Sequence, residues 1–394
     1  MRVTNVYIFN PQNDLALATG GINYVAPPFA LRMAADLAVL PAFIAEPGSL
    51  LITDSDLDAL WLEHLNRAYG LDVHAVKRNQ LRGLSDYSIK PWGWCLDMRR
   101  RLLKWGASAA SVPSKDEIYH LRGLSHRRLS VLIHLRMQQL LGRQLCPPPV
   151  ELAVVEEVMA YVEKYRRCFI KTPWSSSGRG IYHTINSPQP ELEQWCRGAL
   201  KKQGSVLCEQ ALDKVMDLAV EFHCSRGATA LRGFSIFTTD GHSQYREGEV
   251  ASSELLKGKI TTLYPELDEV VAALTQVLNE MVAPHYSGWL GVDILLYKNT
   301  HSAKSERGDR LGIDPCVELN LRPTMGAVTA MLGDNVLAPG THGVFTIEQR
   351  QSTTELWPNH PEPVIESNRL VAGSQVLTPA APDALYRAVL SVDE

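Results

Sequence analysis

The sequence has no cysteine pairs at the spacing of a metal site or of a disulfide framework. Its seven cysteines stand singly, and no Cys-x-x-Cys motif occurs. They lie at positions 95, 146, 168, 196, 208, 224 and 316. An odd and unpatterned set argues against a disulfide-stapled secreted domain and against a structural zinc site, and it is typical of reduced core cysteines in a cytoplasmic protein.

Long apolar runs and a strong net charge are also missing. No run reaches the roughly 20 residues that a membrane-spanning helix needs, and residues 1–4 lead into a strand-like segment without the apolar core of a signal peptide. The formal charge is only −4 over 394 residues, which argues against a general nucleic-acid binder. We therefore expect a cytoplasmic protein that has neither nucleic acid nor a membrane as a partner. The sequence does not indicate its oligomeric state.

Familiar nucleotide-binding and nucleophile signatures are absent as well. The chain contains no Gly-x₄-Gly-Lys-Ser/Thr sequence and no Gly-x-Gly-x-x-Gly fingerprint. No Ser-His-Asp or Cys-His arrangement stands out. Any nucleotide site must be of another type, and the sequence favours chemistry that needs no side-chain nucleophile.

The first part of the chain alternates strand and helix patterns. Apolar strand patterns at residues 3–9, 50–53 and 73–76 flank a helical pattern that ends at Gly70. This order predicts a doubly wound α/β unit. Ligands of such sheets collect at the carboxyl ends of the strands. Polar residues at these ends include Asn10, Asn13, Asp14, Asn23 and Tyr24, which suit a substrate site and an ordinary connecting turn about equally.

A strand pattern at residues 316–323 brings an acid, an amide and a guanidinium to one face. Side chains alternate along a strand, so Glu318, Asn320 and Arg322 point the same way. Mg²⁺ takes hard oxygen ligands, and guanidinium grips phosphate oxygens in a planar fork. The pattern suits a Mg²⁺–polyphosphate site, although by itself it is also what a half-buried strand looks like.

A second stretch places a lysine ahead of a loop of small residues. The apolar strand pattern at residues 168–171 ends in Lys171, and the loop after it runs Ser175, Ser176, Ser177, Gly178, Arg179, Gly180. Small residues let backbone N–H groups approach an anion, and the lysine adds a point charge. The loop is either a phosphate-binding loop or a flexible hairpin, and the lysine favours phosphate.

Two further segments add an acid and an irregular stretch. Asp293 interrupts the apolar strand pattern of residues 288–296, and a carboxylate in such surroundings needs a cation or hydrogen-bond donors. Residues 244–258 show no periodicity, which predicts a long irregular loop. Glu247, Glu249 or His242 from that loop would be available as a general base that takes a proton from a substrate.

The ordered set of these motifs resembles the ATP-grasp superfamily. In chain order they are Lys171 with its loop, Glu209 at a hinge, Asp293, and Glu318-x-Asn320-x-Arg322. The resemblance covers about residues 120–330 and looks most like D-alanine–D-alanine ligases and other carboxylate–amine ligases. It implies an α/β and α+β chain in which the N-terminal doubly wound unit precedes a two-subdomain ATP-grasp fold. The implied divisions are a pre-ATP-grasp-like domain at 1–120, a small subdomain with the glycine-rich loop at 121–210, a subdomain with the metal site at 211–338, and an extension at 339–394.

The resemblance also implies roles for individual residues, with ATP and Mg²⁺ as cofactors. Lys171 would contact the α- and β-phosphates, Ser175, Ser176, Ser177 and Gly178 would lie in the closing loop, and Glu209, Gln210 and Leu212 would hold adenine. Asp217 would bind the ribose, Asp293, Glu318 and Asn320 would hold Mg²⁺, and Arg322 would face the γ-phosphate. One departure is that the family's phosphate-facing lysine before the central helix is replaced here by Arg127.

The implied activity is ATP-dependent joining of a carboxylate to an amine, or to a thiol, through an acyl phosphate. Its substrates would be small-molecule or peptide acids and amines, and Lys171 and Arg322 would be the catalytic cations. Two alternatives stay open: a kinase on the same scaffold that phosphorylates a hydroxyl, and a nucleotide-binding module with degraded catalysis.

Overall fold

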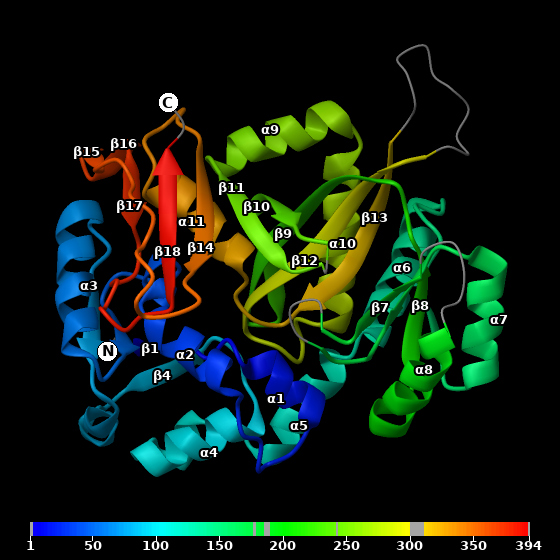
Figure 1. The fold of residues 1–394 in the computed structure, drawn as a ribbon, viewed down its shortest axis with the longest axis horizontal. Coiled ribbons are helices and arrows are strands. Elements are labelled where there is room, and N and C mark those ends of the chain that lie inside the picture. The colour runs from blue at the N-terminus through cyan, green and yellow to red at the C-terminus, as the bar shows by residue number, and fades with distance from the viewer. Residues whose placement is uncertain (1–2, 176–178, 185–189, 242, 300–310, 393–394) are drawn as a thin grey trace.

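A parallel sheet, a small antiparallel sheet and a large antiparallel sheet organise the protein (Figure 1). The structure is a computed structural model that describes residues 3–175, 179–184, 190–241, 243–299 and 311–392. No helix in these ranges combines the length and apolar character that crossing a membrane requires. The mixed architecture confirms the predicted fold class.

The N-terminal unit is a parallel sheet of order β3-β2-β1-β4 with helices on both faces. Its elements are β1 (Thr4–Ile8), α1 (Asn13–Thr19), α2 (Pro28–Asp36), β2 (Ser49–Ile52), α3 (Asp56–Tyr69), β3 (Val73–Val76), β4 (Tyr87–Pro91) and α4 (Leu96–Trp105). Val6 of β1 packs in one core with Met98 of α4, while the adjacent Tyr7 packs in another with Leu62 of α3. The unit is therefore doubly wound, as the strand–helix–strand pattern predicts.

The small antiparallel sheet has the order β5-β8-β6-β7, and α7 and α8 cover one of its faces. Its elements are β5 (Val150–Leu152), α7 (Val155–Tyr165), β6 (Cys168–Lys171), β7 (Ile181–Thr184), α8 (Pro190–Gln203) and β8 (Val206–Gln210), and it follows α5 (Lys115–Leu124) and α6 (Arg128–Leu141). Ile170 and Cys208 pack against α7 and α8 in a shared core. Because side chains alternate along strands, Lys171 and Glu209 point away from these helices.

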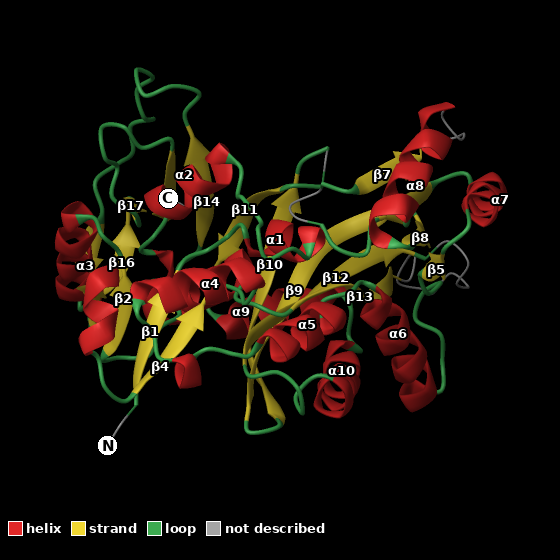
Figure 2. Ribbon diagram, turned by 90° about the horizontal axis from the view of Figure 1, so that it is seen from below, coloured by secondary structure: helices red, strands yellow, loops and turns green. Residues whose placement is uncertain are grey.

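The large antiparallel sheet has the order β13-β12-β9-β10-β11-β14-β18-β17. Its elements are β9 (Lys214–Ser225), β10 (Ala228–Thr239), β11 (Tyr245–Val250), α9 (Ser253–Leu263), α10 (Leu267–Met281), β12 (Gly288–Lys298), β13 (Leu311–Asn320), α11 (Met325–Asn335), β14 (Gly343–Gln349), β17 (Ser374–Val376) and β18 (Tyr386–Val392), with β15 (Val364–Glu366) and β16 (Arg369–Ala372) as a separate pair. Figure 2 shows β9, β12 and β13 running together above α10.

The two faces of the large sheet differ in what covers them. Val220 and Val292 pack with residues of α6, α9 and α10 in one core. The alternate positions Glu221 and Asp293 therefore point to the opposite face, on which α11 also lies. This alternation leaves the face that carries Asp293 free of α9 and α10.

Two segments differ from the sequence-based expectation or go beyond it. The irregular loop expected at 244–258 is wrong, because the structure forms β11 and the start of α9 there. Three strands beyond residue 339, β14, β17 and β18, are part of the large sheet. Phe345 and Leu390 from these strands share a core with Phe9 of the N-terminal unit. The division of the chain at 120, 210 and 338 stays a prediction.

Candidate active site

Three side chains with oxygen ligands converge at the edge of the large sheet. Asp293 of β12 lies directly opposite Glu318 of β13, and Gly291 lies opposite Asn320. Asn320 Nδ2 donates to Asp293 Oδ2 at 3.2 Å, which leaves the amide oxygen of Asn320 for another contact. The structure thus brings together the three residues that the sequence nominates as metal ligands.

Burial disfavours the ionised form of both carboxylates. Burial raises the pKa of Asp293 to about 7, and the neighbouring charge of Glu318 adds to the rise. Burial also opposes ionisation of Glu318, but Arg127 and Lys171 outweigh it and hold the pKa of Glu318 below its ordinary value. A divalent cation would relieve the remaining repulsion, so these oxygen donors fit Mg²⁺.

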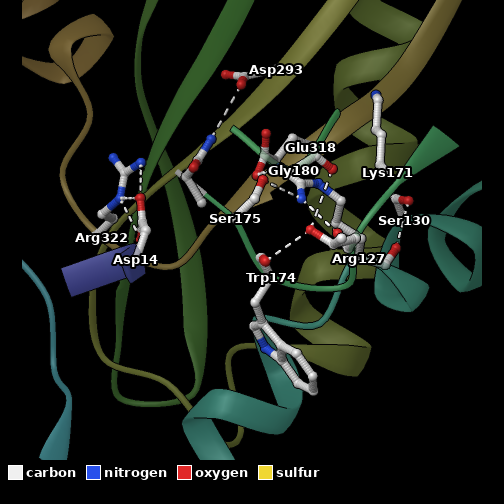
Figure 3. A network of polar contacts seen from close by, with 12 residues as sticks. Asp14, Arg127, Ser130, Lys171, Trp174, Ser175, Gly180, Asp293, Glu318 and Arg322 are labelled. Atoms are coloured by element: carbon white, nitrogen blue, oxygen red, sulfur yellow. Dashed lines mark hydrogen bonds and ion pairs between the residues drawn. The ribbon is translucent and has the colours of Figure 1, made fainter. Parts of the chain in front are cut away.

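Arg127 joins the metal-site candidate to the loop after Lys171. The guanidinium sits at the start of α6 and is buried. Its Nη2 donates to Glu318 Oε1 at 2.7 Å, and its Nη1 donates to Thr172 O at 2.8 Å and to Ser175 Oγ at 2.7 Å. Figure 3 shows Arg127 between Ser175 and Glu318. The nominated Ser176, Ser177 and Gly178 lie outside the described residues.

Lys171 and Glu209 form an ion pair on the face of the small sheet opposite α7 and α8. Lys171 Nζ contacts Glu209 Oε1, and both side chains are largely buried. Burial raises the pKa of Glu209 even though Lys171 opposes the rise. Gln210 follows Glu209 on β8 and points to the other face. Only the backbone of Gln210 therefore faces the same side as Lys171.

A pocket of about 400 Å³ is lined by residues of β6 and β7 and of the connection between β8 and β9. Its lining includes Leu212 and the ring of Phe169, which stacks on His183 with ring centroids 4.4 Å apart and 5° between the planes. Asp217 lies near its rim, where Lys214 Nζ donates to Asp217 Oδ2 at 2.5 Å. Of the nominated nucleoside contacts, Leu212 lines the pocket and Asp217 is held by Lys214.

Arg322 lies at the other side of the metal-site candidate, against the N-terminal unit. Its Nη2 donates to Asp14 Oδ2 at 2.6 Å. A small cavity of about 30 Å³ lies between α1, the segment 173–175 and the end of β13, and Asp14, Ser175, Glu318 and Arg322 line it. The predicted γ-phosphate contact thus meets the N-terminal unit beside Glu318 (Figure 3).

Glu221 was not predicted from the sequence as a site residue. It lies on the same face of the large sheet as Asp293. Its carboxyl group is fully buried, and Thr324 Oγ1 donates to Glu221 Oε1 at 2.7 Å. Burial raises the pKa of Glu221 to about 8. Thr324 caps α11, since its hydroxyl accepts from the amide of Ala327 at 2.9 Å. A lone acid between apolar residues of strand 214–225 was the only sequence signal.

The suggestion that Glu247 or Glu249 deprotonates an amine is wrong. In the β10–β11 pairing Glu249 lies opposite Ile236, which belongs to the core under α9 and α10. Lys259 Nζ of α9 donates to Glu249 Oε2 at 2.5 Å. Both glutamates therefore point to the face away from Asp293 and Glu318. His242 lies outside the described residues.

His134 of α6, Cys146 and Asp314 of β13 form a buried cluster. The ligand atoms of these residues fall within 4.8 Å of one another. His134 Nε2 lies 3.1 Å from Asp314 Oδ1, and Cys146 Sγ lies 3.6 Å from His134 Nδ1. Both ring nitrogens are thus engaged by the other two members, so direct hydrogen bonding accounts for the cluster.

Comparison with known proteins finds likeness in structure only. No protein-family model matches this sequence, and no curated protein matches it. Biotin carboxylase from Campylobacter jejuni, described as a complex with β,γ-ATP, superposes with a TM-score of 0.53 at 12% identity over 100% of this chain and 88% of the other. Pyruvate carboxylase from Rhizobium etli gives a TM-score of 0.51 at 11% identity over 100% of this chain but only 36% of that longer chain.

Proposed function

Because the chain has the ATP-grasp fold, we propose that it is an ATP-dependent ligase that joins a carboxylate to an amine or a thiol through an acyl phosphate. The observation that carries the proposal is the convergence of Asp293, Glu318 and Asn320. Arg127 connects them to the segment that begins at Lys171, because it donates hydrogen bonds both to Glu318 and to the backbone oxygen of Thr172. Oxygen ligands and phosphate-binding cations therefore lie within one connected network.

The donor set supports a magnesium-bound nucleotide. Asp293, Glu318 and the amide oxygen of Asn320 would hold Mg²⁺, which when bound neutralises phosphate charge. The segment that begins at Lys171 would hold the phosphates, and the pocket beside Leu212 would take the base. A pocket of about 400 Å³ is in the size range of small-molecule sites.

The proposed chemistry needs positioned charge rather than a side-chain nucleophile. An oxygen of the substrate carboxylate attacks the γ-phosphorus, and the bond to the β-phosphate oxygen breaks to release ADP. The amine or thiol then attacks the acyl carbon, phosphate leaves with the bonding electron pair, and the proton released from the amine or thiol passes to the departing phosphate or to water. Lys171 and Arg322 would stabilise the charge that develops on the transferring group, and Arg127, which is paired with Glu318, would add to this effect.

A screen for ADP release tests the proposal. The purified protein is incubated with MgATP and paired amino acids, peptides and polyamines, and then with each acid alone plus hydroxylamine. A ligase gives ADP, phosphate and a hydroxamate once its acid is present. A stable phosphoester would instead identify a kinase, and nucleotide binding without turnover over the whole screen would identify a degraded module.

A further inference from the structure

The carboxylate of Asp14, in the N-terminal unit, forms an ion pair with the Arg322 guanidinium. Arg322 Nε donates to Asp14 Oδ2 at 2.9 Å, and Nη2 donates to the same oxygen at 2.6 Å. The two residues stand 308 positions apart in the sequence. Both side chains are mostly shielded from water, with exposures of 21% and 19%. The pair is thus a planar charge-assisted contact rather than a loose surface bridge.

Asp14 stands on a rigid support. It lies in the first turn of α1, directly after the segment that ends β1. Asn10 Nδ2 donates to Gly93 O at 2.8 Å, and the Gly93 amide donates back to Asn10 Oδ1 at 3.2 Å. A side chain at position 93 would collide with Asn13, since its Cβ would lie 2.2 Å from that amide group. The start of α1 is therefore clamped to the segment after β4.

The ion pair with Asp14 leaves some N–H groups of the Arg322 guanidinium available for a ligand. Within the described residues, Arg322 uses Nε and Nη2 toward Asp14 and Nη1 toward Pro323 O at 3.0 Å. A guanidinium has N–H groups in a fixed fork, two on each terminal nitrogen. One N–H on each terminal nitrogen thus remains for an anion in the adjoining cavity, which Glu318 and Ser175 also line.

We infer that Asp14 is a positioning residue that orients Arg322 for the γ-phosphate, so that the N-terminal unit completes the phosphate-transfer site. This inference rests on the proposed function. A free arginine side chain loses much rotational freedom when it binds. Asp14 already restricts the rotation of the Arg322 side chain before the ligand binds, because it holds the Nε side of the guanidinium. The remaining N–H groups stay available to the ligand.

The test compares ATP with ADP, because only ATP carries the γ-phosphate. Calorimetric titration with Mg²⁺ present gives both affinities for wild type and for Asp14→Asn. We expect the substitution to weaken ATP binding by roughly tenfold and to leave ADP binding unchanged. In an Arg322→Ala background the same substitution should have no further effect, since the guanidinium that Asp14 contacts is gone.

The control is Asp54→Asn, which breaks another arginine pair of the same unit, with Arg78. It should change neither affinity. Equal loss of ATP and ADP affinity in Asp14→Asn would show a structural role, and stronger ATP binding would show that Asp14 competes for Arg322; either result overturns the inference. A wild-type protein that binds neither nucleotide would overturn the proposed function instead.

Discussion

His134 and Asp314 form a buried ion pair whose strength depends on pH. Burial lowers the pKa of His134, but the charge and hydrogen bond of Asp314 outweigh burial and leave it raised. Burial raises the pKa of Asp314, but His134 and the amide of Cys316 outweigh that effect and leave it lowered. The histidine contribution to stability is therefore complete below its unfolded pKa of about 6.5 and disappears as pH rises through the folded pKa.

Replacing this histidine should change the pH dependence of stability. His134→Gln leaves Asp314 buried without its cation, so the free energy of unfolding should fall by roughly 3 kcal/mol near pH 6. The difference from wild type should narrow as pH rises, because wild-type His134 loses its proton. Urea denaturation between pH 5.5 and 9 measures both effects.

The exposed pair of His74 and Asp72 supplies the matched control. Its side chains are 60% and 56% exposed, so His74→Gln should leave stability nearly unchanged at every pH. A His134→Gln curve that runs parallel to wild type would show that the buried pair does not titrate in this range.

Single residues also show what the sequence could and could not supply. Glu318 and Asn320 could be paired because strand periodicity fixes which neighbours share a face. Asp14 and Glu221 could not be assigned, since their partners Arg322 and Thr324 lie 308 and 103 positions away. Such contacts depend on how sheets and helices stack, and local patterns carry no information about that.

At the scale of elements, α11 lies unusually close to the large sheet. Its glycines allow the approach, because a Cβ at Gly333 would lie 1.9 Å from the backbone oxygen of Ala251. A Cβ at Gly326 would lie 2.2 Å from Glu221 Oε1. The close packing holds the turn that carries Arg322 against β9.

Two glycine-to-alanine substitutions in helices should therefore have opposite effects. Gly333→Ala forces α11 away from backbone atoms that cannot yield, which should cost about 3 kcal/mol. Gly198→Ala in α8 meets no atom within 4 Å and should stabilise the protein by up to about 1 kcal/mol through helix propensity. Urea denaturation of both variants decides the matter, and a tolerated Gly333→Ala would contradict the packing.

The wrong prediction of an irregular loop at 244–258 has a physical explanation in the packing of β11. β11 has Gly248 where an apolar residue would mark a strand, because Tyr245 of the same strand and Thr329 of α11 leave no room for more. Its glutamates occupy the other face, where Lys259 pairs with Glu249. A β-bulge where it pairs with Thr238 and Thr239 breaks the alternation further. The helical pattern that ends at Gly70 has no such interruption, which is why the end of α3 could be predicted.

At the scale of the whole molecule, one core joins the first and last parts of the chain. Phe9 and Leu40 of the N-terminal unit share it with Leu332 of α11 and with Phe345 and Leu390 of the C-terminal strands. The same arrangement brings Asp14 to Arg322. The site is therefore a product of the complete fold rather than of the small and large antiparallel sheets alone.

Truncation after residue 338 should consequently destroy cooperative folding. It removes β14, β17 and β18, exposes the edge of β11 and opens the shared core. We expect the truncated chain to aggregate or to bind a hydrophobic dye, whereas the full chain unfolds in one transition. A monomeric truncated protein with an unchanged unfolding midpoint would contradict the shared core.

We propose that Glu318 and its neighbours hold a magnesium-bound nucleotide. The most direct test is calorimetric titration of ATP, with and without Mg²⁺, into wild type, Glu318→Gln and Glu249→Gln. The account predicts Mg²⁺-dependent binding that weakens by roughly tenfold or more in Glu318→Gln and is unchanged in Glu249→Gln, whose side chain is on the opposite face. ATP binding that ignores both Mg²⁺ and the loss of the Glu318 charge would contradict it.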